Sequence, residues 1–315
     1  MVEGLSRLAG YKPRVLLVNP HFSETSWAAP DQRLGWINRT GTFASVEPGG
    51  SAMSFAANGT RSSPVAFDRS QRDFLALLVG CSFTQGYSVA DQDTFANYLN
   101  EAFPAAKVVN FGTGGYGTYQ SLLRARLYLD QPHDESERLV IYGLIGDHLN
   151  RNVAVPEWIF GLTDTEGHYF VPPFARFRDG KLIEQAGGPV QNWLLETNSA
   201  AVTLLHRSWL ILTHRVSEQE KADVLRSLIV EMNATTKRAK ARLLVVGLAI
   251  IPEWFKSWST SNDIAYVDCQ NPSYPSPGLA VGGVGHPNAA LHKFWGECIA
   301  RELHREKFSG AILRQ

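Results

Sequence analysis

The stretch Leu75-Ala-Leu-Leu-Val-Gly-Cys-Ser-Phe-Thr-Gln-Gly86 decides the fold. Its apolar run, bounded by glycine, is typical of a buried parallel strand, and Gly80-Cys81-Ser82 then turns the chain toward a helix expected at about residues 91–103. Ser82 therefore stands at the carboxyl end of a strand. Ligands of open α/β sheets bind in the crevice outside such strand ends, so this hydroxyl is placed to act as a nucleophile. The alternative is an ordinary strand-to-helix turn with a capping serine.

Strands alternate with helices from about Arg72 onward. This alternation predicts a mainly parallel sheet with helices on both faces. The long helix is well supported, because apolar residues recur at helical spacing between charged ones. Strands are expected at 75–79, 107–111, 139–145, 243–249 and 264–268, and helices at 118–129, 200–213, 218–241 and 287–305.

Two segments fall outside the alternation. Residues 1–66 are broken by prolines and glycines into short strands and turns, and we expect them to pack as an extension on a main domain of residues 67–315. Roughly residues 153–199 form an aromatic-rich insertion, with a hairpin expected to turn at Asp179-Gly180. The insertion either shapes a pocket or forms a small aromatic core of its own.

Composition and charge exclude several classes of protein. Thirty basic residues balance thirty acidic ones among 315, so no net field favours nucleic acid or an anionic membrane surface. No apolar run approaches the roughly 18 residues of a membrane-spanning helix, and no export signal is evident. We expect a cytoplasmic protein as the sequence stands, and a periplasmic or extracellular one if a signal or anchor precedes it.

The cysteines indicate neither a disulfide nor a metal site. Cys81, Cys269 and Cys298 are widely spaced, odd in number and without a CxxC pair. We expect them to be small buried hydrophobic side chains.

A glycine-rich block follows the second expected strand. Gly112, Gly114 and Gly117 form a GxGxxG, which in dinucleotide-binding proteins cradles a pyrophosphate. The block belongs to the second strand instead of the first, and Asp147 lies about thirty residues on, where about twenty are expected. We favour the alternative, in which the glycines let a backbone N–H point at a developing oxyanion.

The segment Gly282-Gly-Val-Gly-His-Pro-Asn288 leads into the last helix. Proline at the first helical position leaves His286 as the cap, on a glycine-rich loop after the last strand. His286 is therefore expected at the same rim of the sheet as Ser82. A single histidine is more often structural, so the evidence that His286 is functional comes from its combination with the other sequence blocks.

Together these blocks resemble the SGNH/GDSL hydrolase family. They are Gly-x-Ser-Phe-Thr-x-Gly at 80–86, Asn-x-Gly-x-Gly-Gly at 110–115 and His-Pro-Asn at 286–288. The resemblance covers about 74–303, and residues 33–61 look like the amino-terminal extension of some bacterial members. It implies a three-layer α/β/α, flavodoxin-like fold with a central parallel sheet of about five strands.

The resemblance also implies roles for individual residues. Ser82 would be the nucleophile, with its own amide in the oxyanion hole, and Gly115 would be the family's oxyanion glycine. His286 would be the general base that takes the serine proton and returns it to the leaving group. No metal or organic cofactor is implied.

One departure from the family pattern concerns the third block. Gly146, just before Asp147, stands where the family has an asparagine oxyanion donor. Loss of such a donor typically costs about a hundred- to a thousandfold in rate, so activity should be weak or the substrate unusual unless Asn150, Asn152 or His148 replaces it.

A second departure concerns the partner of the histidine. Gly283 stands where the family has an acid, three residues before His286. His286 then forms a dyad with the serine, bonds to a backbone carbonyl, or uses a more distant acid such as Asp268. Cys81 also replaces the acid that opens the serine block.

Two functions follow from these residues. The first is a serine esterase or acyl-transfer enzyme for small acyl esters, with an acetylated carbohydrate as one candidate substrate. The second is a protein of the same fold that has lost turnover and binds a glycan or a protein partner through the aromatic insertion. Turnover requires Ser82 within hydrogen-bond reach of His286, and a fixed separation beyond about 5 Å would exclude the enzyme.

Overall fold

The computed structural model describes residues 2–17, 26–64, 74–132, 135 and 137–305. The chain divides into two compact units. Unit 1 comprises Met1–Ile37 and Leu149–Leu225, and unit 2 comprises Asn38–His148 and Arg226–Gln315.

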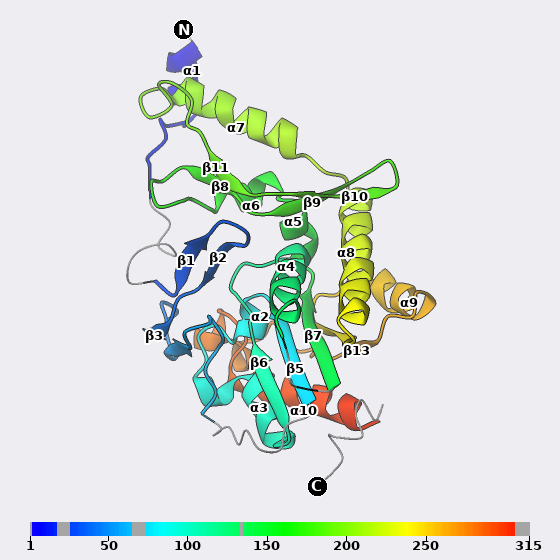
Figure 1. The fold of residues 1–315 in the computed structure, drawn as a ribbon. Coiled ribbons are helices and arrows are strands. Elements are labelled where there is room, and N and C mark those ends of the chain that lie inside the picture. The colour runs from blue at the N-terminus through cyan, green and yellow to red at the C-terminus, as the bar shows by residue number, and fades with distance from the viewer. Residues whose placement is uncertain (1, 18–25, 65–73, 133–134, 136, 306–315) are drawn as a thin grey trace. The chain divides into compact units, whose positions relative to one another are not determined.

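The core of unit 2 is a parallel sheet that carries the candidate site (Figure 1). Its strands, in spatial order, are β13 (Tyr266–Asp268), β12 (Arg242–Ala249), β7 (Glu137–Ile145), β5 (Phe74–Gly80) and β6 (Ala106–Asn110), and every neighbouring pair is parallel. Numbered along the chain, this is the flavodoxin-like order 2-1-3-4-5. The five-stranded parallel sheet predicted from the sequence is confirmed.

Helices cover both faces of this sheet. On one face, α3 (Phe95–Ala102) and α10 (Ala289–Arg305) pack against each other and on side chains such as Leu78 and Ile141. On the other face, α4 (Thr118–Leu129) contacts β5 and β7, and Thr118 hydrogen-bonds with Tyr142. The remaining elements of unit 2 are α2 (Ser82–Gln85), α9 (Glu253–Ser261), the part of α8 (Glu218–Arg238) from Arg226 on, the antiparallel pair β3 (Gly41–Phe43) and β4 (Met53–Phe55), and the 3-10 turns η3 (Asp91–Asp93), η4 (Pro277–Leu279) and η5 (Val281–Gly283). The α/β/α architecture expected from the alternation is therefore present.

Unit 1 is built from helices and short antiparallel strand pairs. The strands pair as β1 (Ala28–Asp31) with β2 (Gly35–Asn38), β8 (Tyr169–Val171) with β11 (Gly188–Val190), and β9 (Phe174–Arg178) with β10 (Lys181–Gln185). The helices are α1 (Val2–Leu8), α5 (His148–Asn152), α6 (Pro156–Phe160), α7 (Ala200–His214) and the start of α8 (Glu218–Arg238). The hairpin predicted at Asp179-Gly180 is confirmed, because Arg178 pairs with Lys181 across it. Phe160, Tyr169 and Phe174 gather with Leu210 in a small core, as one of the two interpretations of the insertion expected.

The first 64 residues are shared between the two units. Arg14 hydrogen-bonds with Gly167 and Thr203 of unit 1, whereas Arg61 hydrogen-bonds with the chain at Gly86 and Val89 of unit 2. The structure therefore divides the chain differently from the sequence, which predicted one extension of residues 1–66. The predicted boundary between residues 66 and 67 lies outside the described residues.

The expectation that all three cysteines are unpaired is wrong. Cys269 and Cys298 form a disulfide across 29 residues, with their Cα atoms 5.9 Å apart, and Cys81 is free and buried. The cause is tertiary, because the sheet brings the end of β13 against α10. No helix in the described ranges combines the length and apolar character needed to cross a bilayer.

Candidate active site

Ser82 lies where the sequence placed it, at the turn between β5 and α2. A Cβ atom at Gly80 would meet Thr84 Oγ1 at 2.1 Å, so the tight turn before the serine requires glycine. Ser82 itself is 6% exposed. Its Oγ lies 3.1 Å from Nε2 of His286, within hydrogen-bond distance. The structure therefore brings together the two residues that the sequence singled out as nucleophile and base.

The other nitrogen of His286 contacts a glutamate that the sequence analysis missed. Nδ1 lies 2.5 Å from Oε1 of Glu47, and the backbone N–H of His286 donates to Oε2 at 3.3 Å. Since Glu47 accepts at Nδ1, the network assigns the proton to Nδ1 and leaves Nε2 free to accept the proton of Ser82. Ser82, His286 and Glu47 thus form a connected series of side-chain hydrogen bonds.

Glycines allow the two loops that carry Glu47 and His286 to approach. Glu47 opens a turn closed by the hydrogen bond from the Gly50 N–H to its carbonyl, with Gly49 at φ +78°. A Cβ atom at Gly282 would meet the carbonyl oxygen of Pro48 at 2.5 Å. The glycine-rich segment before His286 is therefore what admits the Glu47 turn. Glu47 is also the only acidic residue between 38 and 64, which is the one signal that sequence reasoning could have used.

Asp268 does not lie against the histidine. Its Oδ1 accepts from the backbone N–H and the side-chain amide of Gln270, both at 3.1 Å. An acid distant in sequence does contact His286, but it is Glu47 instead of Asp268. The carboxylate of Asp268 is engaged in a local hydrogen-bonded loop at the end of β13.

Gly115 occupies a turn that is tied to the serine strand. The N–H of Tyr116 donates to the carbonyl of Thr113 across Gly114-Gly115, and Gly115 has φ +82°, as the third residue of a type II turn requires. The N–H of Thr113 donates to the carbonyl of Gly80 at 3.0 Å, which fixes this turn beside the end of β5. Within the described residues, neither the Ser82 N–H nor the Gly115 N–H has a protein acceptor.

Gly146 cannot be replaced by the family's asparagine without a shift of the backbone. Its N–H donates to the carbonyl of Ala249, and a Cβ atom would meet the carbonyl oxygen of Ile250 at 2.4 Å. Ile250 has φ +53°, a strained conformation for a β-branched residue. The backbone conformation at Ile250, after the end of β12, therefore explains why glycine stands at position 146 where the SGNH/GDSL pattern has asparagine.

The other predicted residues of the third block are spread apart. His148 is fully buried, and its Nδ1 lies 2.6 Å from the hydroxyl of Tyr142, so its ring is engaged inside unit 2. Asn150 is exposed on α5 and belongs to unit 1. Asp147 is exposed, and its charge contributes to raising the pKa of Tyr274.

Aromatic rings surround the histidine. Tyr87 and Phe83 lie 4.7 Å and 6.0 Å from the His286 ring, centroid to centroid, and Phe83 makes an edge contact with Tyr274. Burial, with smaller contributions from Glu47, Asp147 and Cys81, raises the pKa of Tyr274 to about 12. The Tyr274 hydroxyl therefore keeps its proton at neutral pH and is available as a hydrogen-bond donor.

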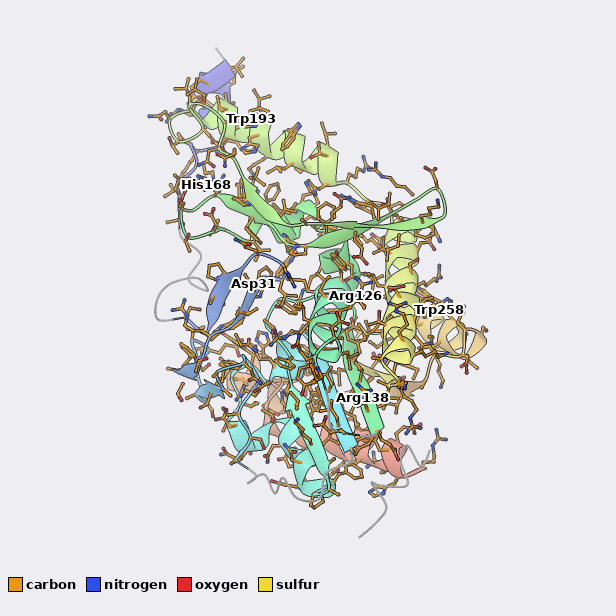
Figure 2. The ribbon with its side chains drawn as sticks, viewed as in Figure 1. Asp31, Arg126, Arg138, His168, Trp193 and Trp258 are labelled. Carbon is orange, nitrogen blue, oxygen red and sulfur yellow. A yellow bond between two sulfur atoms is a disulfide. The ribbon has the colours of Figure 1, made fainter. Side chains whose placement is uncertain are left out.

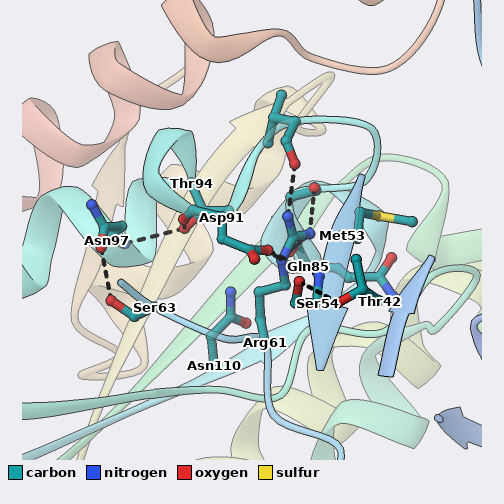
Figure 3. A network of polar contacts seen from close by, with 12 residues as sticks. Thr42, Met53, Ser54, Arg61, Ser63, Gln85, Asp91, Thr94, Asn97 and Asn110 are labelled. Atoms are coloured by element: carbon teal, nitrogen blue, oxygen red, sulfur yellow. Dashed lines mark hydrogen bonds and ion pairs between the residues drawn. The ribbon is translucent and has the colours of Figure 1, made fainter. Parts of the chain in front are cut away.

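A buried arginine holds the loop that follows the serine (Figure 3). Arg61 donates through Nε to Asp91 at 2.8 Å and through its two terminal nitrogens to the carbonyls of Gln85, Gly86 and Val89. Burial lowers the pKa of Arg61, and the Asp91 carboxylate opposes that shift. Residues 38–64 therefore support α2 as well as supplying Glu47.

No protein-family model matches the sequence, and no curated protein is significantly similar to it. Several solved structures resemble it, among them the following two. A member of the lipolytic G-D-S-L family from Veillonella parvula DSM 2008 is 11% identical with a TM-score of 0.43, and the match covers 74% of this chain and 99% of that one. A protein assigned to the same family from Desulfitobacterium hafniense DCB-2 is 15% identical with a TM-score of 0.40, over 72% and 98%. This likeness is weak, so function is inferred below from the geometry around Ser82.

Proposed function

We propose that this protein is a serine ester hydrolase or acyl-transfer enzyme that uses Ser82, His286 and Glu47. The observation that carries the proposal is the pair of contacts made by one imidazole, 3.1 Å from Nε2 to Ser82 Oγ and 2.5 Å from Nδ1 to Glu47 Oε1. This geometry is that of a serine activated by a base which a third group orients. The Ser82–His286 distance lies well inside the limit of about 5 Å beyond which turnover would be excluded.

The first half of the reaction forms an acyl-enzyme. Ser82 Oγ attacks the ester carbonyl carbon while its proton passes to His286 Nε2, and the Glu47 carboxylate stabilises the imidazolium. The N–H groups of Ser82 and Gly115 are the candidate donors to the oxyanion of the tetrahedral intermediate. As the intermediate collapses, the C–O bond to the alcohol breaks and the alcohol oxygen takes the proton from Nε2.

The second half releases the acyl group. A water molecule, or the hydroxyl of an acceptor, gives its proton to His286 Nε2 and attacks the acyl carbon. The proton then returns to Ser82 Oγ as the acyl–serine bond breaks. Water as the attacking group gives hydrolysis, and an acceptor alcohol gives transfer. One proton leaves with the alcohol and one enters with the water molecule or the acceptor hydroxyl, so Ser82, His286 and Glu47 are restored at the end of the cycle.

The proposed substrate is an ester of a small acyl group, with an acetylated carbohydrate as the candidate to test first. Tyr274 and Phe83 contribute to this choice, because aromatic faces and a protonated phenol suit a sugar ring with hydroxyl groups. Gly146 favours an acyl donor that does not need the missing side-chain amide.

The second candidate function is binding without turnover, and Gly146 is the observation that favours it. The carbonyl of Ile250 leaves no room for a side chain at position 146, so no side-chain oxyanion donor can stand there. A protein of this kind would bind an acylated glycan at Ser82 and leave the ester intact.

Hydrolysis of short-chain chromogenic acyl esters separates the two candidates. The wild-type chain is expected to hydrolyse the acetyl ester, and Ser82→Ala to lose at least about a thousandfold in kcat/KM. Equal rates for the two proteins would overturn the proposed enzyme and leave the binding function, which acylated-glycan affinity of both proteins would then measure.

A further inference from the structure

Helix α7 of unit 1 is apolar on two opposite faces. On its inner face His206 and Leu210 are buried. On the other side Leu205, Trp209 and Leu212 follow one another at positions i, i+4 and i+7, and they are 57%, 44% and 75% exposed. A surface helix normally keeps its apolar side chains on its inner face, so an exposed apolar outer face on α7 indicates a surface that a partner covers.

Helix α1 and the segment after it enlarge this face. Helix α1 lies beside the start of α7 (Figure 1). Glu3 fixes it there, because its carboxylate accepts from Ser199 Oγ and from the N–H groups of Ala200 and Ala201. These bonds lower the pKa of Glu3 to about 2. We use "the apolar surface" for the exposed side chains of α1, the following segment and α7, namely Val2, Leu5, Leu8, Val15, Leu16, Leu17, Leu205, Trp209, Ile211 and Leu212.

A tryptophan flanks the apolar surface beside α7. Trp193, which Figure 2 labels, stacks on His206 with ring centroids 4.9 Å apart and lies 6.1 Å from the ring of Trp209. Trp193 is itself 40% exposed. Paired half-exposed tryptophans at the edge of an apolar surface are typical of the boundary between lipid headgroups and acyl chains.

A groove of about 830 Å³ runs beside these side chains, entirely within unit 1. Its lining includes Lys12, Arg14, Phe160, Tyr169 and Arg207, and none of its lining residues in the described part of the chain is acidic. Arg14 is already engaged within the protein, because its guanidinium lies 3.6 Å from the carboxylate of the buried Glu196 and over the ring of Tyr169.

Two cations of this groove remain for a ligand. Lys12 and Arg207 are exposed, and neither makes an ion pair with a carboxylate in the described part of the chain. The Arg207 guanidinium is held over the face of Phe160, 4.2 Å from the ring centre, which fixes its direction at the groove. A groove with two unpaired cations and no acid suits a phosphate group.

The local charge indicates which kind of partner covers the apolar surface. Residues 2–17 and 200–215 hold five basic residues and one acid, Glu3. Arg7 pairs with Glu3 and Arg14 with the buried Glu196, so Lys12, Arg207 and Arg215 carry the positive excess. The net charge of the whole chain is balanced and gave no reason to expect an anionic membrane partner. This face is nevertheless both basic and apolar. The 15 residues of α7 extend over about 22 Å, too short to span a hydrocarbon core of about 30 Å, so the helix can lie in the interface but not cross it.

We propose that the apolar surface of unit 1 docks on an anionic phospholipid bilayer. Leu205, Trp209 and Leu212 enter the acyl boundary, and Lys12 and Arg207 bind lipid phosphates from the groove. An amphipathic surface with cations at its edge gains both apolar burial and attraction to anionic headgroups. This inference does not depend on ester hydrolysis, since all of its residues lie in unit 1 and the candidate site lies in unit 2.

Co-sedimentation of the full chain with vesicles tests the proposal. Wild type is expected to bind phosphatidylcholine vesicles that contain phosphatidylglycerol, and to bind pure phosphatidylcholine vesicles about tenfold more weakly. The variant Leu205→Ser/Leu212→Ser should lose at least about tenfold in binding to both. Lys12→Gln/Arg207→Gln should lose the preference for phosphatidylglycerol and the salt dependence that goes with it.

A matched control and the size of the particle complete the test. Val230 on α8 is 48% exposed but lies outside the apolar surface, so Val230→Ser should bind vesicles as wild type does. Absence of wild-type binding, or equal binding by wild type and Leu205→Ser/Leu212→Ser, would overturn the proposal. So would a wild-type dimer that becomes a monomer in that variant and does not bind vesicles, because the cover would then be a second copy of the chain.

Discussion

The proposed chemistry of this site depends on three side chains from distant parts of the sequence. Ser82 follows a buried strand, His286 precedes the last helix, and Glu47 comes from a turn 239 residues before the histidine it contacts. Each lies next to a glycine that a larger residue could not replace without a shift of its surroundings or backbone strain. These are Gly80 before Ser82, Gly282 before His286 and Gly49 in the turn of Glu47. The roles of the first two could be predicted from motifs, because short-range turn chemistry defines them.

The glutamate could not be predicted in the same way. Its contact with His286 is a tertiary one, and neither charge spacing nor strand order in the sequence points from Glu47 to that loop. The sequence instead directed attention to Asp268, which ends a strand at the correct rim but bonds to Gln270.

Replacement of the two acids distinguishes their roles. Glu47→Gln keeps the shape of the side chain but no longer stabilises the imidazolium or fixes the tautomer, so kcat for the acetyl ester should fall by about a hundred- to ten-thousandfold. Asp268→Asn is the matched control and should leave kcat within about twofold. Steady-state kinetics of both variants decide the matter, and a larger loss for Asp268→Asn would reverse the assignment.

At the scale of elements, the parallel sheet supplies the rim and the segment between β13 and α10 supplies the histidine. Apolar runs and the alternation of strands with helices allowed the five strands to be predicted within a few residues. A strand buried on both faces has a continuous apolar run, which the sequence shows directly. The disulfide was not predicted, because Cys269 and Cys298 become neighbours only after β13 and α10 have packed. This bond closes the segment that contains His286 at both ends.

Removal of the disulfide should loosen the segment of His286. Closing a loop of 29 residues contributes about 3 to 4 kcal/mol in the chain-entropy model. Cys269→Ala/Cys298→Ala should therefore lower Tm by about 5 °C. Thermal unfolding with and without reductant measures this effect. Reductant should lower the Tm of wild type toward that of the variant and leave the variant unchanged; a shift in the variant would refute the explanation.

At the scale of the whole molecule, the structure comprises two units whose boundary the sequence did not indicate. The sequence suggested one extension because residues 1–66 share their proline and glycine punctuation. Arg14 and Arg61 nevertheless place its two parts in different units through buried hydrogen bonds. Such long-range polar contacts leave no local pattern, unlike the apolar periodicity that revealed the sheet.

The stability of the molecule in acid should depend on a buried histidine of α10. Burial, with smaller effects of Arg61 and His286, lowers the pKa of His292 to about 3. The unfolded chain binds this proton near pH 6.5 and the folded chain does not, so stability is full above that pH and is lost as pH falls. The loss from this group is about 1.4 kcal/mol per pH unit between about pH 6 and the folded pKa.

Denaturant unfolding at several pH values tests this contribution. His292→Gln keeps an acceptor for the Phe95 N–H, which donates to His292 Nδ1, but it cannot titrate. The variant should therefore show a flatter dependence of unfolding free energy on pH below 6.5 than wild type. His214→Gln, at a half-buried histidine whose pKa burial also lowers, is the control and should keep the steep dependence that His292 causes. Parallel profiles for wild type and His292→Gln would contradict the assignment.

The most direct test of the proposed active site is the reaction of the wild-type chain with a fluorophosphonate, followed by peptide mapping of the adduct. Reaction at a serine requires the activation that His286 and Glu47 are proposed to give. We predict one adduct, on Ser82, that forms much more slowly in His286→Ala and Glu47→Gln. Absence of an adduct, or an adduct on another serine that persists in Ser82→Ala, would contradict the account.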